Sequence, residues 1–434
     1  MSIQTSRPAV IHAVCLLAIG AFGAVSTLPA ATINVASGGS IQTAINAANA
    51  GDTIVVATGT FTEQLVVSKS LTLTGAGIGS TIVQAPAALA VDATVPPSAG
   101  GQATAIVKVD SSAVVSITGF TIQGPGTTAC GSIGYGVFVG GGANLTFNND
   151  RIAEIRDNPP GGCQNGVGIR AGAASTAQIG TLTMSNSSVV NFQKAGVVVD
   201  NTGSSATLTN NTVTGLGPLG IAANGIQISR GATATVTGNT ISGNECNIAP
   251  PTCGSDPIAN AQGTGLLLYD AGAVSASNNT ISTNDVGVAA YDDTTTGVGT
   301  ITLTGNTLNG NRYENLFAES ATLQLANNTL TGSIYGIYLA TETGDVASTS
   351  AALSGCNVVS GASVAPTNVV NANGTTTTAT LTGTVSAIAC AAAVIPSVPA
   401  PASTPFGLLL EILALAAATL VFARTRARRM SRRR

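Results

Sequence analysis

Two short clusters of tyrosine and aspartate in the middle of this chain could do chemistry. They are Tyr269-Asp270 and Tyr291-Asp292-Asp293, and each follows an apolar stretch that begins with glycine. Two neighbouring carboxylates can act as acid and nucleophile on a glycosidic bond, or can bind Ca²⁺. Tyrosine rings beside them can stack on a sugar. The corresponding segments of other repeats add polar candidates for ligand binding: Arg170, Asp200, Arg230 and Glu319.

These clusters have two interpretations that differ in geometry. In the catalytic interpretation, Asp270 and Asp292 flank a cleft, and Tyr269 and Tyr291 form its floor. In the structural interpretation, the aspartates bond to the backbone of their own turns, because strands that end in solvent carry polar residues. The position of Asp270, Asp292 and Asp293, in a cleft or on a flat turn, decides between the two.

The elements that would position these residues repeat along the chain. A phrase of the form Asn/Gly-Asn-Thr-aliphatic begins at positions 210, 238, 278, 305 and 327. The stretches between the phrases alternate apolar residues with Thr or Ser, which is typical of β-strands. One long step contains an insert, Glu245–Gln262, and the other steps are 22–28 residues. A unit of this size, with three strands and three turns, predicts a solenoid of stacked coils.

One turn of each coil carries a polar residue at the same position. Neighbouring coils would hold such residues about 4.8 Å apart, so that inward-turned amides can hydrogen-bond up and down the stack. We therefore predict a structural ladder at this position rather than a ligand site. Its members are Asp150, Ser187, Asn211, Asn239, Asn279, Asn306, Asn328 and Asn357.

The N-terminal part of the repeat region resembles a known group of proteins. Ser40 precedes an apolar helical face that would cap the open end of the core. The segments Gly51–Glu63 and Lys69–Gly75 resemble the opening of right-handed parallel β-helix proteins of the pectin lyase-like superfamily. Together with the repeats, the resemblance covers about residues 32–390. It implies an all-β fold, a single right-handed parallel β-helix with a short N-terminal capping helix.

The same resemblance leaves the function open, because the superfamily includes lyases, hydrolases, epimerases, esterases and adhesins. Its enzymes act in a groove beside one parallel sheet. The Gly-His-Gly element of its galacturonan hydrolases is missing, since the one histidine, His12, lies near the N-terminus. The outward positions of the glycine-opened strands are expected to be mostly apolar and covered by inserts or by another protein: Phe138, Gly168, Val198, Gln227, Leu267, Ala289, Phe317 and Tyr338.

Six cysteines follow the N-terminal segment. An even number of cysteines in an exported protein suggests disulfides. Six cysteines can pair in fifteen ways, and the best prediction joins each cysteine to its neighbour in the sequence. It joins Cys130 to Cys163, Cys246 to Cys253, and Cys356 to Cys390. The alternative is that some are free buried thiols. A zinc site is not expected, because the chain has no Cys-x-x-Cys motif.

The two ends of the chain indicate export. Residues 1–31 have the features of a signal peptide, with Arg7 before an apolar run. Residues 391–405 form a proline-rich linker, 406–423 an apolar segment long enough to span a membrane, and 424–434 an arginine-rich tail expected in the cytoplasm. This order is similar to PEP-CTERM and IPTL-CTERM sorting tails, although Ala400 stands where the first form has Glu. The resemblance implies processing by an exosortase-type enzyme; a plain membrane anchor is the alternative.

The charge of the exported part limits its partners. Residues 32–405 contain 8 Lys and Arg against 18 Asp and Glu, a net charge of −10. Such a surface disfavours nucleic acid as a partner.

The favoured function is a cell-surface or exopolymer-associated protein with a structural, adhesive or carbohydrate-matrix-binding role. The alternative is a polysaccharide lyase or glycoside hydrolase. Extracellular polysaccharide is the expected partner, and Ca²⁺ is the one cofactor left open.

Overall fold

The computed structural model describes residues 29–97, 102–247, 253–293, 299–345, 347–372 and 376–389. The chain divides into two units, residues 1–385 and 386–434. The expected signal peptide up to residue 28, Cys390, the linker after it, the apolar segment 406–423 and the basic tail lie outside the described residues. In the described part of the chain, no helix combines the length and the apolar character that crossing a membrane requires.

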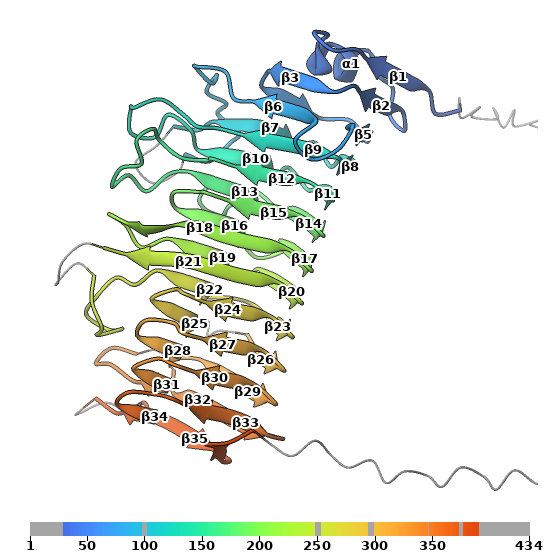
Figure 1. Ribbon diagram of the computed structural model, residues 1–434. Helices are drawn as coiled ribbons and strands as arrows, with labels where there is room; N and C mark the ends of the chain where they lie inside the picture. The colour runs from blue at the N-terminus through green and yellow to red at the C-terminus, as the bar shows by residue number, and fades with distance from the viewer. Residues whose placement is uncertain are drawn as a thin grey trace, which may run out of the picture. The chain divides into compact units, whose positions relative to one another are not determined.

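The first unit is a right-handed parallel β-helix, which confirms the predicted fold. Its strands form three parallel sheets, here called sheets A, B and C, and the coils from β2 to β34 each contribute one strand to each sheet in that order. Figure 1 shows the coils stacked from the blue N-terminal end to the red C-terminal end.

Sheet A has thirteen strands in sequence order. They are β1 (Thr32–Val35), β2 (Thr53–Val56), β5 (Thr72–Thr74), β8 (Val114–Thr118), β11 (Ala143–Asn148), β14 (Gly180–Ser185), β17 (Ser205–Thr209), β20 (Thr233–Thr237), β23 (Val274–Ser277), β26 (Ile301–Thr304), β29 (Thr322–Ala326), β32 (Thr349–Ser354) and β35 (Ala379–Thr382).

Sheet B has twelve strands, and the repeated phrase leads into five of them. They are β3 (Gly59–Thr62), β6 (Thr81–Gln84), β9 (Phe120–Gln123), β12 (Arg151–Ala153), β15 (Ser188–Val190), β18 (Thr212–Leu219), β21 (Thr240–Cys246), β24 (Thr280–Ser282), β27 (Thr307–Asn309), β30 (Thr329–Thr331), β33 (Asn357–Ser360) and β36 (Val385–Ser386).

Sheet C has eleven strands, and in seven of them the second residue is the glycine that opens the repeated sequence pattern. They are β4 (Leu65–Val67), β7 (Ala105–Val109), β10 (Tyr135–Val139), β13 (Val167–Ala171), β16 (Ala195–Asp200), β19 (Asn224–Ser229), β22 (Thr264–Tyr269), β25 (Val286–Tyr291), β28 (Glu314–Glu319), β31 (Tyr335–Ala340) and β34 (Ala365–Val370). A 3-10 helix, η1 (Ala174–Thr176), follows β13.

The N-terminal end is capped as the sequence predicts. Helix α1 (Ile41–Ala47) begins after Ser40, whose side chain accepts a hydrogen bond from the Thr43 amide. The carboxylate of Glu63 accepts bonds from the amides of Ile41 and Gln42 at 2.8 and 3.0 Å. These bonds satisfy donors that the first turn of a helix leaves free. The apolar face of the helix packs on the core, because Ile41 and Ile45 are buried.

The glycines of sheet C are needed because neighbouring coils approach closely at these positions. A Cβ at Gly196 would lie 2.4 Å from Cγ1 of Val213, and one at Gly168 would lie 2.4 Å from Cγ1 of Val189. Gly168 therefore occupies the opening-glycine position of its strand. This corrects the prediction that Gly168 points outward: the residue paired with Phe138 and Val198 is Arg170.

The asparagine column forms a continuous hydrogen-bonded ladder in the buried turn between sheets A and B. In each step, one amide oxygen accepts bonds from both the backbone N–H and the side-chain Nδ2 of the asparagine one coil earlier. For example, Oδ1 of Asn279 accepts from N and Nδ2 of Asn239 at 2.9 and 3.0 Å. The same pattern joins Asn211, Asn239, Asn279, Asn306, Asn328 and Asn357. Ser187 and Asp150 continue the column toward the N-terminus.

A second, shorter ladder lies in the turn between sheets B and C. The Asn244 Nδ2 donates to Oδ1 of Asn284 at 2.8 Å, and Asn284 Nδ2 donates to Oδ1 of Asn311 at 3.0 Å. Each of these residues is buried. Sequence analysis missed this ladder, although its members lie five positions after Asn239, Asn279 and Asn306 of the first one. It fixes the turns that lead into the strands of the candidate site.

Candidate functional site

A groove of about 760 Å³ lies on the outer face of sheet C, across β19, β22, β25 and β28. Its floor consists of the outward side chains of the middle of these strands, including Leu267, Ala289 and Phe317. These residues are paired in register from coil to coil. The expected apolar outer face is therefore present here, and it forms the base of a groove.

One wall of the groove is the insert between β21 and β22. Residues 257–262 of this insert line the groove. The insert is held at its base by Asp285, whose Oδ2 accepts hydrogen bonds from the amides of Cys246 and Gly263, both at 2.8 Å. A disulfide joins Cys246 to Cys253. Both ends of the insert are thus tied to the start of β25, which fixes the position of the wall.

The opposite wall contains a column of three ionisable side chains. Tyr269, Tyr291 and Glu319 occupy the same position in consecutive strands β22, β25 and β28. The ring centroids of the two tyrosines lie 5.2 Å apart with the planes tilted by 58°. The guanidinium of Arg230 lies 5.3 Å from the centroid of the Tyr269 ring. All four residues line the groove, so the stacking predicted for the tyrosines places them at a cavity.

Two of the three candidate aspartates lie as the structural interpretation describes, and not at a cleft as the catalytic one does. Asp270 and Asp292 are buried, and neither is among the described residues that line the groove. Asp270 sits in a left-handed turn with φ of 46°, and its Oδ1 accepts a hydrogen bond from the Asp293 amide at 2.9 Å. Burial, together with a hydrogen bond to Asp292, raises the pKa of Asp270 to about 6. These two residues stabilise the turn, and only Asp293 reaches the groove.

Arg170 and Asp200, both predicted as ligand-binding candidates, serve a structural role. Asp200 is buried and bridges two guanidinium groups, with Oδ2 at 2.5 Å from Nη2 of Arg170 and Oδ1 at 2.9 Å from Nη1 of Arg230. Burial alone would raise the pKa of Asp200, but the charges of the two arginines hold it below its ordinary value. Arg170 lies within β13 rather than past its end. Of this cluster, Arg230 alone lines the groove.

The groove is acidic at its C-terminal end. Glu319, Glu342 and Asp293 line this end. Burial and then the charges of Asp345 and Glu342 raise the pKa of Glu319 to about 8. A carboxyl group with this pKa is mostly protonated at neutral pH and can donate a hydrogen bond or a proton.

The N-terminal end of the groove is basic. Lys194 and Arg230 line this end, and Lys194 Nζ donates to the carbonyl of Ala222 at 2.7 Å. Burial lowers the pKa of the Lys194 ammonium to about 8. The groove therefore offers donors at one end, acceptors and a protonated acid at the other, and an apolar floor between them.

A fully buried glutamate at the start of β28 was not identified from the sequence. Glu314 occupies the position paired with Val286, itself a groove residue. Burial raises the pKa of Glu314 to about 8, against a smaller opposing effect of the Gln262 amide. The sequence signal was available, because Glu314 is charged at a position where the paired strands on either side have Val286 and Tyr335.

The cysteines are paired where the described residues allow a test. Disulfides join Cys130 to Cys163 and Cys246 to Cys253. Cys356 is disulfide-bonded, and its predicted partner Cys390 lies outside the described residues.

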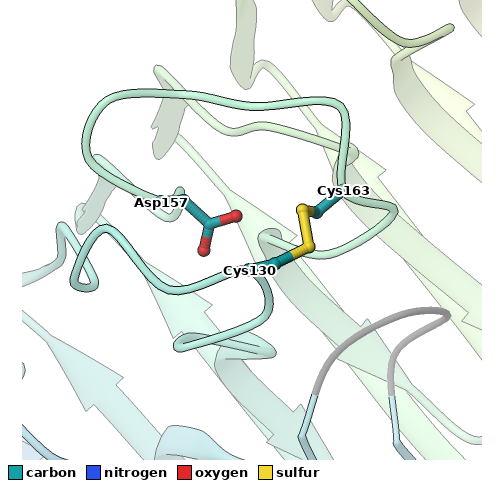
Figure 2. Close-up of side chains that lie close together, drawn as sticks. All are labelled: Cys130, Asp157 and Cys163. Carbon is teal, nitrogen blue, oxygen red and sulfur yellow. A yellow bond between two sulfur atoms is a disulfide. The ribbon is translucent and has the colours of Figure 1, made fainter.

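One group of three potential metal ligands occurs among the described residues. It consists of Cys130, Asp157 and Cys163, with ligand atoms within 4.8 Å of one another. Figure 2 shows that the two sulfur atoms are bonded to each other beside the Asp157 carboxylate. A disulfide sulfur is not a thiolate, so this arrangement does not fit a metal ion. Within the same described ranges, Asp270, Asp292 and Asp293 are not such a group.

Comparison with known proteins identifies the repeat. Residues 168–358 match the family model described as right handed beta helix region. A comparison with curated protein sequences finds no match.

Among solved structures, the chain is similar to an alginate lyase from Paenibacillus sp. str. FPU-7, with 18% identity, a TM-score of 0.46, and coverage of 79% of this chain and 97% of that one. It is also similar to the A-module of the mannuronan C-5 epimerase AlgE4 from Azotobacter vinelandii, with 14% identity, a TM-score of 0.47, and coverage of 79% and 95%. The residues that line the groove lie within the segment that matches the family model.

Proposed function

We propose that this protein is an exported β-helix protein that binds a polysaccharide in the groove on sheet C. A groove of about 760 Å³ has the size of small-ligand sites and is open enough for a segment of a chain. Tyr291 carries the proposal, because its ring lines the groove between the apolar floor and the carboxyl groups of Asp293 and Glu319. Sugars present apolar C–H faces and hydroxyl edges, and this arrangement offers a partner for each.

The proposal is tested by filling the groove. Ala289 lies on the floor with 4% of its surface exposed, and Ala289→Trp would occupy the space of a sugar ring. We expect the full chain to be retarded in gels that contain at least one of a panel of neutral and acidic polysaccharides. Ala289→Trp is expected to weaken this binding at least about tenfold, equivalent to about 1.4 kcal/mol. Thr240→Trp, at an exposed position on sheet B, is the matched control. Retardation that is equal for both variants would contradict the proposal.

A second candidate function is cleavage of the bound polysaccharide, and Glu319 favours it. Glu319 supplies a protonated carboxyl group in the groove, and the Asp293 side chain lies nearby on the same wall. Together they could act as a general acid and a general base. Cleavage would release reducing ends or unsaturated products, with or without added Ca²⁺. Glu319→Gln should then lower turnover by at least about 10²-fold. Asp270→Asn should have a smaller effect, because Asp270 does not line the groove.

Export and delivery to the cell surface or exopolymer matrix are part of the same proposal. They are supported by the sequence features of residues 1–31, 391–405, 406–423 and 424–434. An exosortase-type enzyme would process the tail, and the membrane would hold residues 406–423 until then. Replacing Arg424, Arg426, Arg428 and Arg429 with Ser should prevent surface delivery, because these charges fix the cytoplasmic side. Unchanged delivery in cell fractionation would show that the tail is not read in this way.

A further inference from the structure

A second cavity, of about 470 Å³, lies on the outer face of sheet A. Its lining comes from β14, β17, β20, β23 and β26 and from the turns that precede β23 and β26. Figure 1 shows these strands stacked one below another in chain order. The cavity is thus a trough that crosses five strands along the axis of the solenoid. Parallel strands lie about 4.8 Å apart, so the trough is roughly 19 Å long.

The sides of the trough are two columns of small hydroxyl side chains. The register of the strands sets both columns. One column contains Thr207, Thr235, Ser275 and Thr302. The other contains Thr181, Ser205, Thr233, Ala273 and Thr300, so its hydroxyl groups are interrupted at Ala273. The residues between the columns are Ala206, Ala234 and Val274, which are small or β-branched and belong to the buried core. In the part of the chain that the structure describes, no charged or aromatic side chain lines this cavity.

The hydroxyl groups of these columns are available to a ligand. Among the described residues, no side-chain hydrogen bond engages Thr207, Thr235 or Ser275, and all three are exposed. The hydroxyl column two residues further along these strands is different, because its members are bonded to each other: the side-chain oxygens of Thr237 and Ser277 lie 3.0 Å apart. Threonine is stiff about χ1, so the hydroxyl and methyl groups are held in a fixed array before any ligand binds.

The chemistry of the trough selects a neutral, elongated ligand rich in hydroxyl groups. Each threonine offers a donor, acceptors and a methyl group, which match the hydroxyl edge and the C–H face of a pyranose ring. A polyanion would find no cation in the trough, and a cationic polymer would find no carboxylate there. The repeat of one coil, about 4.8 Å, is comparable to the advance of one ring in an extended β-linked glycan.

We propose that this trough is a second carbohydrate-binding site, which holds roughly four rings of an extended neutral β-glycan across the coils. The trough stands on its own observations and does not depend on the groove. If both sites are occupied, one protein molecule holds two polymer segments on two different sheets and can cross-link a matrix. Bridging therefore also rests on the function proposed for the groove.

The test is calorimetric titration of the full chain with cellohexaose. Thr207→Val/Thr235→Val removes two hydroxyl groups with little change of shape, and Thr207→Glu/Thr235→Glu adds charge at exposed positions. We expect the Val pair to weaken binding at least about fivefold and the Glu pair to abolish it, since each lost hydrogen bond contributes modestly. Thr240→Glu on sheet B is the matched control and should bind like the unchanged protein.

The groove variant separates this site from the first. Ala289→Trp leaves the trough intact and should retain cellohexaose binding at the trough, whatever ligand the groove prefers. Cellohexaose that does not bind the unchanged protein, or that binds Thr207→Glu/Thr235→Glu equally well, would overturn the second site. Binding lost only in Ala289→Trp would assign cellohexaose to the groove and likewise reject the trough. Thermal melting of each variant checks that the fold is kept.

Discussion

Tyr269 and Tyr291 occupy the same position in consecutive strands of sheet C, with ring centroids 5.2 Å apart. The two rings do not have the same surroundings. Arg230 lies over the ring of Tyr269, whereas Tyr291 stands beside Glu319 at the acidic end of the groove. Burial raises the pKa of both phenols to about 12, so both stay neutral at physiological pH, and the difference between them is the guanidinium over Tyr269. Tyr291 is therefore the ring best placed to contact a ligand.

Replacing Tyr291 should separate stacking from hydrogen bonding. Tyr291→Ala is expected to weaken binding of the polysaccharide found in the gel panel by about tenfold, because it removes an aromatic contact. Tyr291→Phe keeps the ring and should cost less than about threefold. Titration calorimetry measures both. Equal affinities of the Ala variant and the unchanged protein would exclude Tyr291 from the binding surface.

The insert that forms one wall of the groove should strengthen binding because it is already held in place before a ligand arrives. Cys246→Ser/Cys253→Ser removes the disulfide that spans seven residues, while Asp285 still holds the base of the insert. We expect affinity for the polysaccharide to fall roughly three- to tenfold, because a looser wall must be ordered when the ligand binds.

The matched control for this change is Cys130→Ser/Cys163→Ser. It removes a disulfide with a larger separation of 33 residues, whose cysteines do not line the groove. This pair should lower the free energy of unfolding more than the first, since a longer loop constrains the unfolded chain more. It should leave affinity unchanged. A loss of affinity in this control as large as in the insert variant would indicate a general loss of stability instead.

The fold was predictable because its signals recur in every coil. The phrase around Asn239, Asn279 and Asn306 marks the inward turn, and its spacing gives the size of one coil. Errors arose where a coil departs from the repeat. Gly166 and Gly168 both precede apolar residues in the same coil, so alternation alone did not show which one aligns with the glycines of the neighbouring strands. The register decides it, because Val167 pairs with Ala195 and Ile169 with Val197, which sets Gly168 opposite Gly196.

The candidate site was predictable only in part. The order of the coils was enough to place Tyr269 next to Tyr291. It did not show that the left-handed backbone at Asp270 leads its side chain into the turn, where the carboxyl group is buried. The wall of the groove comes from an insert with no repeated counterpart. Its position depends on bonds from both of its ends to Asp285, which lies in the next coil and far away in sequence.

The ladder should contribute measurably to stability. Asn279→Leu removes the acceptor for two donors of Asn239 and the donor to the carbonyl of Val236, all in a buried turn. Buried groups left without partners cost free energy, and we expect the free energy of unfolding in urea to fall by roughly 1–3 kcal/mol. Thr280→Ala, at the exposed position next to it, should change this value much less. An equal effect of the two substitutions would show that the ladder is not a stabilising element.

Glu314 should make the stability of the protein depend on pH. Its carboxyl group is fully buried, and burial raises its pKa from about 4.5 to about 8. Between these values the unfolded chain releases a proton that the folded chain keeps, so the free energy of unfolding should fall as pH rises through this range and then level off. Glu314→Gln imitates the protonated acid and removes this decline. We expect the variant and the unchanged protein to be similar at pH 5, and the variant to be more stable at pH 9 by roughly 1–3 kcal/mol. Urea unfolding at the two pH values measures the difference. A difference of the same size at both would show that the Gln side chain acts through packing rather than through the charge of Glu314.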